Sequence, residues 1–248
     1  MLASQERTAY DDRQRLFLQS LLSYKILDED KAMELYRRVC QLTEKDQIDF
    51  AEFIASINKE INEMDIAIRR SHNQRDGQPI LALVNTKEDE IAQIATHYTA
   101  NEISYFRQLI ELIMMSDDED YAVQSMTALQ LGQKMKPLLT QKETEELLDR
   151  FVEDGWLYLT PTGVYTMDNR ALLELQAYLR QQFGDVVKEC LMCFEVITMG
   201  ERCELQNCSS RIHRHCADGY FRTASSMVCP MCQTRWSRSN TFGKGLPP

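Results

Sequence analysis

The feature that most constrains this sequence is a cluster of metal-ligand residues between Cys190 and Cys232. These 43 residues hold seven of the eight cysteines and two of the four histidines. The spacing is C-x2-C-x9-C-x4-C-x4-H-x2-C-x12-C-x2-C, and the ligands are Cys190, Cys193, Cys203, Cys208, His213, Cys216, Cys229 and Cys232. A C-x2-C pair presents two sulfurs to one tetrahedral ion, so eight ligands predict two zinc ions. Closed four-coordinate sites leave no position for a substrate and are structural.

A disulfide framework is the alternative for so many cysteines. It needs an oxidising compartment, whereas Met1 to Tyr10 is polar and lacks the apolar segment of a secretion signal. Seven cysteines would also leave one unpaired. A segment this short needs a metal or another cross-link to fold. Two structural zinc ions at roughly 10 kcal/mol or more each would dominate its stability. We therefore expect zinc.

The pattern resembles two families of cross-braced zinc finger, RING and PHD, in which alternate ligand pairs share a metal. By that resemblance Cys190, Cys193, His213 and Cys216 hold one zinc, and Cys203, Cys208, Cys229 and Cys232 hold the other. A single histidine in fifth place is the usual PHD order. However, Cys229-Pro-Met-Cys232 matches the C-P-x-C ending of RINGs, and Met227 stands where a PHD has an aromatic residue. A RING-like finger is favoured, with His215 as a spare.

RING fingers recruit ubiquitin-conjugating enzymes, and the resemblance implies where such an enzyme would bind. Met192 precedes the second ligand, and Gln233 follows the eighth, where active RINGs often carry a cation. Tyr220 and Phe221 stand where a tryptophan would deepen the groove. The implied contact residues are Met192, Tyr220, Phe221, Pro230 and Gln233.

Helical periodicity from Asp11 to Ile61 predicts three helices. Leu18, Leu21 and Leu22 mark the first, and the third carries one apolar stripe: Phe50, Phe53, Ile54, Ile57 and Ile61. Strands are expected over Asp65 to Arg70 and Pro79 to Val84, around the turn signal Arg75-Asp-Gly77. Three helices followed by a hairpin predict a winged helix over residues 11–98, after a flexible N-terminus at residues 1–10.

The same order repeats over residues 99–185. A helix around Phe106 is followed by a short helix over Met126 to Gln133 and a third over Gln141 to Val152, with Thr140 and Glu143 as a capping box. Strands flank Pro161-Thr-Gly163, and a closing helix covers Arg170 to Phe183. The acidic run Asp117 to Asp120 is expected to be a solvated loop. The finger covers residues 188–236, and residues 237–248 are expected to be a flexible tail.

Charge argues against a role in binding nucleic acid directly. The net charge of the chain is −10. Residues 1–187 carry 33 acidic and 20 basic residues, whereas residues 188–248 carry 5 acidic and 8 basic residues. Winged helices that read DNA place the third helix in the major groove. Here Gln141 to Val152 has four acidic residues and two basic ones, which would repel phosphate. Protein-binding winged helices are favoured, with no strong direct DNA binding.

Other function classes lack their signals. No apolar run approaches the roughly 18 residues of a membrane span. No nucleotide-binding loop, G-x-S-x-G, HExxH or paired-carboxylate motif is present, so no catalytic residue is expected. Any transferase activity would position the thioester of another enzyme. The predicted fold class is α+β, mainly α, with two tandem winged helices followed by a small cross-braced two-zinc finger.

This arrangement resembles one family, the non-SMC element 1 subunits of the structural-maintenance-of-chromosomes 5/6 complex. The resemblance covers about residues 12 to 236. It rests on the finger spacing, on Asp76-Gly-Gln-Pro-Ile-Leu-Ala-Leu-Val-Asn85 in the first wing, and on Asn101-Glu102 and Phe106-Arg107. The four-residue gap between Cys203 and Cys208 is longer than expected and implies a looser knuckle.

The resemblance implies a nuclear, chromatin-associated subunit acting in DNA repair and recombination. Its winged helices would bind a MAGE-type winged-helix subunit, non-SMC element 3, alongside a kleisin subunit, non-SMC element 4. The finger would support ubiquitin transfer by a conjugating enzyme, as a RING-type ligase that is weak alone and stimulated by its partner. The alternative is a non-enzymatic assembly module whose finger only organises the complex, and a chromatin reader is a third possibility.

Overall fold

The structure, a computed structural model, describes residues 10–86 and 97–246. These residues form two compact units, residues 10–72 with 78–86 and residues 73–77 with 97–246. Residues 1–9 of the expected flexible N-terminus, residues 87–96 of the first predicted domain and residues 247–248 of the expected tail lie outside the described residues. Within the described ranges, no helix is both long and apolar enough to cross a membrane.

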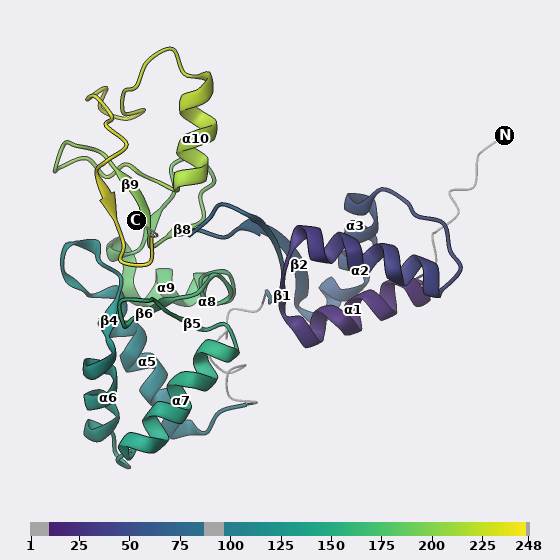
Figure 1. Ribbon diagram of the computed structural model, residues 1–248, viewed down its shortest axis with the longest axis horizontal. Coiled ribbons are helices and arrows are strands. Elements are labelled where there is room, and N and C mark those ends of the chain that lie inside the picture. The colour runs from purple at the N-terminus through teal and green to yellow at the C-terminus, as the bar shows by residue number, and fades with distance from the viewer. Residues whose placement is uncertain (1–9, 87–96, 247–248) are drawn as a thin grey trace. The chain divides into compact units, whose positions relative to one another are not determined.

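The first unit is a winged helix. Its elements are α1 (Asp12–Tyr24), β1 (Ile26–Asp28), α2 (Glu29–Leu42), α3 (Phe50–Ile61), the 3-10 turn η1 (Asn62–Met64), β2 (Ile66–His72) and β3 (Pro79–Asn85). The strand order is β1-β3-β2, and β3 pairs antiparallel with both neighbours. Figure 1 shows α1, α2 and α3 packed together beside these strands. The predicted order of three helices and a hairpin is confirmed.

The apolar stripe of α3 forms the core of this unit, as predicted. The carboxylate of Asp49 caps the helix by accepting the N–H groups of Ala51 and Glu52 at 2.9 and 3.0 Å. All five stripe residues are buried, but in α1 the core residue beside Leu21 is Phe17, and Leu22 is 52% exposed. Strand β1 was not predicted, because three residues are too few to show an alternating pattern.

The second unit contains another winged helix. Its elements are α5 (Ala100–Met114), η2 (Asp117–Glu119), β4 (Val123–Gln124), α6 (Ser125–Lys134), α7 (Gln141–Glu153), β5 (Leu157–Leu159), β6 (Val164–Met167), α8 (Asn169–Glu174) and α9 (Gln176–Phe183). The strand order is β4-β6-β5. The predicted capping box at the start of α7 is present, since Thr140 and Glu143 bond reciprocally to each other's backbone N–H. The predicted closing helix is instead two helices that meet at the fully buried Leu175.

The finger follows in the same unit. Its elements are η3 (Gly184–Val186), β7 (Lys188–Glu189), β8 (Val196–Ile197), β9 (Gly200–Arg202), β10 (Arg211–Ile212), α10 (Arg214–Thr223) and β11 (Thr241–Phe242). Strands β7 and β8 form a hairpin, and β9 lies between β10 and β11 in a three-stranded sheet. The predicted fold class, mixed and mainly helical with a small C-terminal finger, is confirmed.

The second winged helix and the finger share one continuous hydrophobic core. A single cluster of buried residues runs from Tyr98 to Phe242 and includes metal-ligand candidates such as Cys190 and Cys229. Tyr98, which the sequence assigned to the first domain, belongs here, because its ring packs on Phe151 at 4.9 Å and its hydroxyl donates to Asp154 at 2.7 Å. The finger is therefore not an independent globule joined by a linker.

The expected flexible tail is ordered as far as residue 246. Strand β11 pairs with β9, and Phe242 is buried with its ring 6.2 Å from that of Tyr121. Gly243 has φ +83°, and a Cβ on it would overlap the carbonyl oxygen of Thr198, so only glycine fits there. The structure differs from the expected flexible tail over these residues, because the ring of Phe242 is buried and Arg238 pairs with the buried Glu201.

The acidic run, expected to be a solvated loop, instead binds the finger. Glu119 forms a bidentate ion pair with Arg211 at 2.7 and 2.8 Å, and both side chains are largely buried. Asp118 pairs with Arg202 at 3.0 Å, although Asp118 itself is 78% exposed. The carbonyl of Glu119 also accepts the N–H of Gly243 at 3.1 Å. We call residues 117–120 the acidic clamp.

Residues 73–77 also group with the second unit. The side chain of Gln74 is buried, accepts the N–H of Thr198 at 3.1 Å and donates to the carbonyl of Val196 at 3.3 Å. Gly77 adopts φ +73°, and a Cβ there would lie 2.8 Å from Cβ of His215. The turn signal in the sequence thus coincides with a segment where both conformation and space require glycine.

Candidate metal centres

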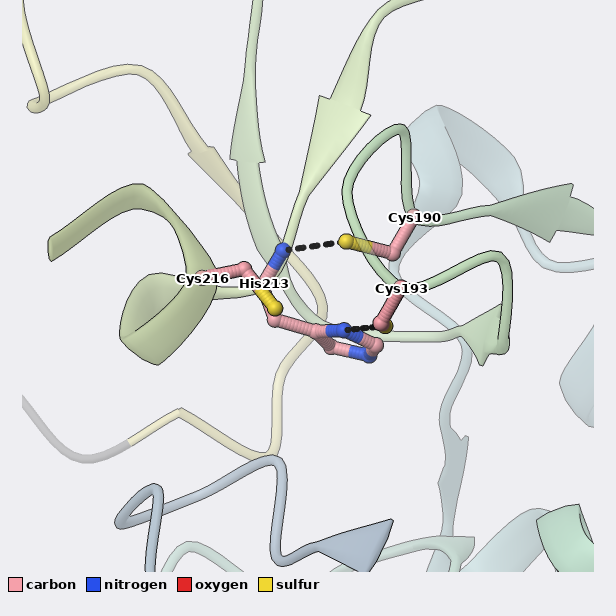
Figure 2. Close-up of side chains that lie close together, drawn as sticks. All are labelled: Cys190, Cys193, His213 and Cys216. Carbon is pink, nitrogen blue, oxygen red and sulfur yellow. Dashed lines mark hydrogen bonds between the residues drawn. The ribbon is translucent and has the colours of Figure 1, made fainter. Parts of the chain in front are cut away.

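The first group of candidate ligands is assembled from two short segments. Cys190 and Cys193 lie on the turn after β7, while His213 and Cys216 lie at the start of α10 (Figure 2). The ligand atoms of these four residues all lie within 4.8 Å of one another. Nδ1 of His213 is 3.4 Å from Sγ of Cys193, and the backbone N–H of His213 points to Sγ of Cys190 at 3.5 Å. The four side chains converge on a space of the size of one metal ion.

The second group consists of Cys203, Cys208, Cys229 and Cys232, whose sulfurs also lie within 4.8 Å of one another. Sγ of Cys203 is 3.4 Å from Sγ of Cys232, and Sγ of Cys208 is 3.8 Å from Sγ of Cys229. The four-residue gap after Cys203 is closed by a hydrogen bond from the N–H of Cys208 to the carbonyl of Leu205 at 2.9 Å. Both groups contain the residues that the resemblance implied.

The first and last C-x2-C pairs of the finger are each followed by a residue in the left-handed conformation. After each pair one residue, Phe194 or Gln233, adopts φ +62°. Its N–H donates to the carbonyl of the first cysteine, at 2.9 Å for Cys190 and 3.0 Å for Cys229. This tight knuckle aims both sulfurs inward. No sequence signal marks this turn, because neither left-handed residue is glycine or asparagine.

Without a cation, the sulfurs of the first group share their protons unequally. Hydrogen bonds from the Cys193 and Cys216 thiols hold the pKa of Cys190 far below its usual range. The same contacts with Cys190 raise the pKa of Cys193 to about 11 and that of Cys216 well above its usual range. Sulfurs this close cannot all ionise unless a cation balances them. The group is therefore suited to exchanging protons for a divalent metal.

The second group shows the same pattern with different causes. Burial raises the pKa of Cys203 to about 12. Hydrogen bonds with the hydroxyl and the backbone N–H of Thr234 lower the pKa of Cys232 to about 6. Burial opposes ionisation of Cys229, but contact with the Ser210 hydroxyl and backbone amides lowers its pKa overall. Two Cys/His groups able to bind metal ions are thus present.

His215, expected to be a spare, lies outside both groups. Its ring stacks on that of His213 with centroids 5.1 Å apart and planes 13° apart. The first turn of α10 presents His213 and Cys216 to the first group, while His215 supports the His213 ring from one side.

The residues expected to contact a conjugating enzyme differ in exposure. Gln233 is exposed, and Met192, Tyr220 and Pro230 are partly exposed. Phe221 is only 9% exposed, since it packs against Trp236 at 5.7 Å in the core of the finger. Its burial argues against a surface contact. Larger apolar surfaces that the sequence did not single out are Phe194 and Met231, at 68% and 56% exposed.

A buried carboxylate in the finger also escaped prediction. Glu201 is 1% exposed, accepts the indole N–H of Trp236 at 2.7 Å and pairs with Arg238 at 2.8 Å. Arg238 also pairs with Asp218 on α10 at 2.6 Å. These contacts tie the C-terminal segment to α10. No local pattern marks them, because the partners lie 20 to 37 residues apart in the chain.

Comparison with known proteins assigns both parts of the chain. Residues 14–175 match the family described as Nse1 non-SMC component of SMC5-6 complex, and residues 190–232 match the RING-like domain family. Similar proteins include the non-structural maintenance of chromosomes element 1 homologs of Xenopus laevis and Homo sapiens. The first is 33% identical over 225 residues, covering 89% of this chain and 81% of the homolog. The human protein is 33% identical over 228 residues, covering 91% and 84%.

More distant comparisons agree. Non-structural maintenance of chromosomes element 1 of Schizosaccharomyces pombe is 30% identical over 193 residues, covering 78% of this chain and 79% of that protein. A chain of the solved Nse1-Nse3-Nse4 complex superposes with a TM-score of 0.79 at 31% identity, covering 91% of this chain and 96% of that one. The resemblance inferred from the sequence is confirmed: this chain belongs to the Nse1 family, the non-SMC component of the SMC5-6 complex, and carries a RING-like domain.

Proposed function

We propose that this chain is a nuclear, chromatin-associated subunit of the SMC5-6 genome-maintenance complex, acting in DNA repair and recombination. The observation that carries the proposal is the agreement along nearly the whole chain with a subunit solved as part of an Nse1-Nse3-Nse4 complex. By that likeness its partners are the MAGE-type subunit, non-SMC element 3, and the kleisin subunit, non-SMC element 4.

The charge of the winged helices supports a protein partner. On α7 the two cations are already paired, Arg150 with Glu102 and Lys142 with Glu146. Exposed Glu145 and Asp149 remain on the same helix. Such a surface repels phosphate and suits a protein interface with a charged rim.

We propose that each of the two Cys/His groups holds one zinc ion. Tetrahedral zinc with Zn–S bonds of about 2.3 Å places its sulfurs about 3.8 Å apart. The sulfur pairs in the second group are 3.4 and 3.8 Å apart, so the residues present fit the ion. Bound zinc would supply cross-links between segments, and four protein ligands leave it no open position for catalysis.

We propose that the finger supports ubiquitin transfer by holding a conjugating enzyme, without covalent catalysis. The support is the RING-like match over residues 190–232. The proposed contact surface comprises Met192, Tyr220, Pro230 and Gln233, all with exposed area. An uncharged Gln233 in place of a cation predicts weak activity for the chain alone, which partner subunits would raise.

A second candidate function has its own supporting observation. The finger shares a core with the second winged helix and is held by the acidic clamp. A finger so integrated suits a non-enzymatic module that only organises the complex.

Co-purification and ubiquitin discharge test these proposals in turn. The full chain, co-expressed with its element 3 and element 4 homologues, should elute as one complex in size-exclusion chromatography, and failure to associate would refute the subunit assignment. The complex should discharge ubiquitin from a conjugating enzyme about tenfold or more faster than the chain alone, equivalent to about 1.4 kcal/mol. If the complex is stable but does not accelerate discharge from any conjugating enzyme, the non-enzymatic assembly role is the function that remains.

A further inference from the structure

We propose that Ser210 and Thr234 are positioning residues of the second metal group, holding its thiolates through hydroxyl hydrogen bonds. This inference rests on the proposed zinc binding. Ser210 is fully buried, and its Oγ lies 3.1 Å from Sγ of Cys229 and 3.3 Å from Sγ of Cys208. Oγ1 of Thr234 lies 3.3 Å from Sγ of Cys232.

The remaining sulfur of the group also has a donor. The backbone N–H of Leu205 points to Sγ of Cys203 at 3.4 Å. Every sulfur of the second group therefore has a hydrogen-bond donor within reach, and two of the three donors are side-chain hydroxyls. In the first group, by contrast, Cys190 is approached by the backbone N–H of His213.

The difference in ligand charge explains why the second group needs such donors. Four thiolates around a divalent cation carry a net charge of −2, whereas three thiolates and an imidazole carry −1. Three of the four sulfurs belong to buried residues, Cys203, Cys208 and Cys229. Negative charge out of water is costly unless hydrogen bonds stabilise it. When the sulfurs are metal-bound thiolates, the hydroxyls act as donors.

Ser210 has one hydroxyl proton and so donates to one sulfur at a time. Cys229 is the nearer acceptor, and its side chain is fully buried. The serine backbone is fixed, because its carbonyl accepts the guanidinium of Arg211 at 2.9 Å and the N–H of Cys203 at 3.3 Å. Sγ of Cys208 is the next nearest sulfur to this hydroxyl, at 3.3 Å. The hydroxyl is thus aimed at the sulfurs by the surrounding backbone.

The adjacent serine provides a matched control. Ser209 is exposed, and its hydroxyl points to the sulfur of Met231 at 3.8 Å, outside the metal group. Ser209→Ala and Ser210→Ala remove the same atom from neighbouring positions. Thr234→Val removes the second hydroxyl with almost no change in volume, so it leaves no cavity and remains informative if Ser210→Ala folds poorly.

Zinc transfer from the full-length chain to a chromogenic chelator tests the inference. Loss of a partner hydrogen-bonded to a metal ligand typically lowers metal affinity by about 10- to 100-fold. One of the two zinc equivalents should therefore leave about tenfold or more faster in Ser210→Ala, and also faster in Thr234→Val. The other equivalent should leave at the wild-type rate, and Ser209→Ala should match the wild type for both.

Cobalt substitution gives a readout that a loss of packing alone would not produce. Removing a hydrogen bond raises the energy of the sulfur electrons, so the sulfur-to-cobalt charge-transfer absorption should move to longer wavelength in Ser210→Ala and Thr234→Val but not in Ser209→Ala. Unchanged spectra and release rates in both hydroxyl variants would overturn the inference while leaving zinc binding intact. A wild-type chain without zinc would instead refute the proposed zinc binding itself.

Discussion

The pair between Glu119 and Arg211 gives the most direct perturbation of the junction between the second winged helix and the finger. The two side chains are 20% and 10% exposed and share two short charged hydrogen bonds. Arg211 also donates to the carbonyls of Cys208 and Ser210, so it joins the acidic clamp to the second metal group. Glu119→Ala would leave the guanidinium partly buried and without its anion.

Two known magnitudes bound the loss of unfolding free energy that we expect for Glu119→Ala. Breaking a fully buried ion pair costs about 3–5 kcal/mol, and a charged hydrogen bond contributes about 1.5–3 kcal/mol. Arg211 is partly exposed and keeps its two carbonyl acceptors, which reduces this cost. We therefore expect Glu119→Ala to lower the free energy of unfolding by about 2–4 kcal/mol. For a unit of this size that lowers the midpoint of thermal unfolding by roughly 4–16 °C. Glu119→Gln, which keeps the shape and can keep one hydrogen bond, should lose less.

Tryptophan fluorescence isolates the relevant unit. Both tryptophans of the chain, Trp156 and Trp236, lie in the second unit and are buried, so their emission follows that unit during thermal unfolding. Asp118→Asn is the matched control, since this neighbouring acid pairs with Arg202 but is 78% exposed and should matter little. Wild-type midpoints for both Glu119→Ala and Asp118→Asn would refute the idea that the pair of Glu119 and Arg211 holds the finger.

Three further substitutions test other parts of the account. Gln233→Arg should raise thioester discharge by up to about tenfold, because a charged hydrogen bond contributes about 1.5–3 kcal/mol against 0.5–1.5 for a neutral one, and about 1.4 kcal/mol is tenfold in rate. Met192→Ala should lower discharge, and rates unaffected by both changes would place the activity elsewhere. Phe242→Ala should cost about 3–5 kcal/mol in the same fluorescence-detected unfolding, since the ring is 5% exposed. Leu205→Ala, at a residue 48% exposed, is its control, and equal stability of the two variants would contradict a buried C-terminal strand.

Features predicted from the sequence were those that depend on neighbours in the chain. The capping box of Thr140 and Glu143 and the stripe of α3 follow from spacings of three and four residues, and both are present. The candidate ligands could be named because C-x2-C spacing is itself local. Their division into two groups came from the family resemblance, and the structure brings together the same two sets of four.

The misjudged features depend on partners far away in the chain. The acidic clamp reads as a polar loop because Arg202 and Arg211 lie 84 and 92 residues further on. The C-terminal segment reads as disordered because its burial rests on Phe242 meeting Tyr121. Phe221 was expected to contact a conjugating enzyme, but its ring packs against that of Trp236 in the core of the finger. Sequence periodicity carries no information about such pairings.

The measurement that tests the central claim most directly is the zinc content and chelator response of the purified full-length chain. Two groups of four ligands predict two zinc equivalents per chain, and their removal by a chelator should unfold the finger and change the emission of the buried Trp236. Cys40 lies outside both groups, so Cys40→Ala should still bind two equivalents. One equivalent or none, or a finger whose fluorescence and thermal unfolding are unchanged by chelator, would contradict the account.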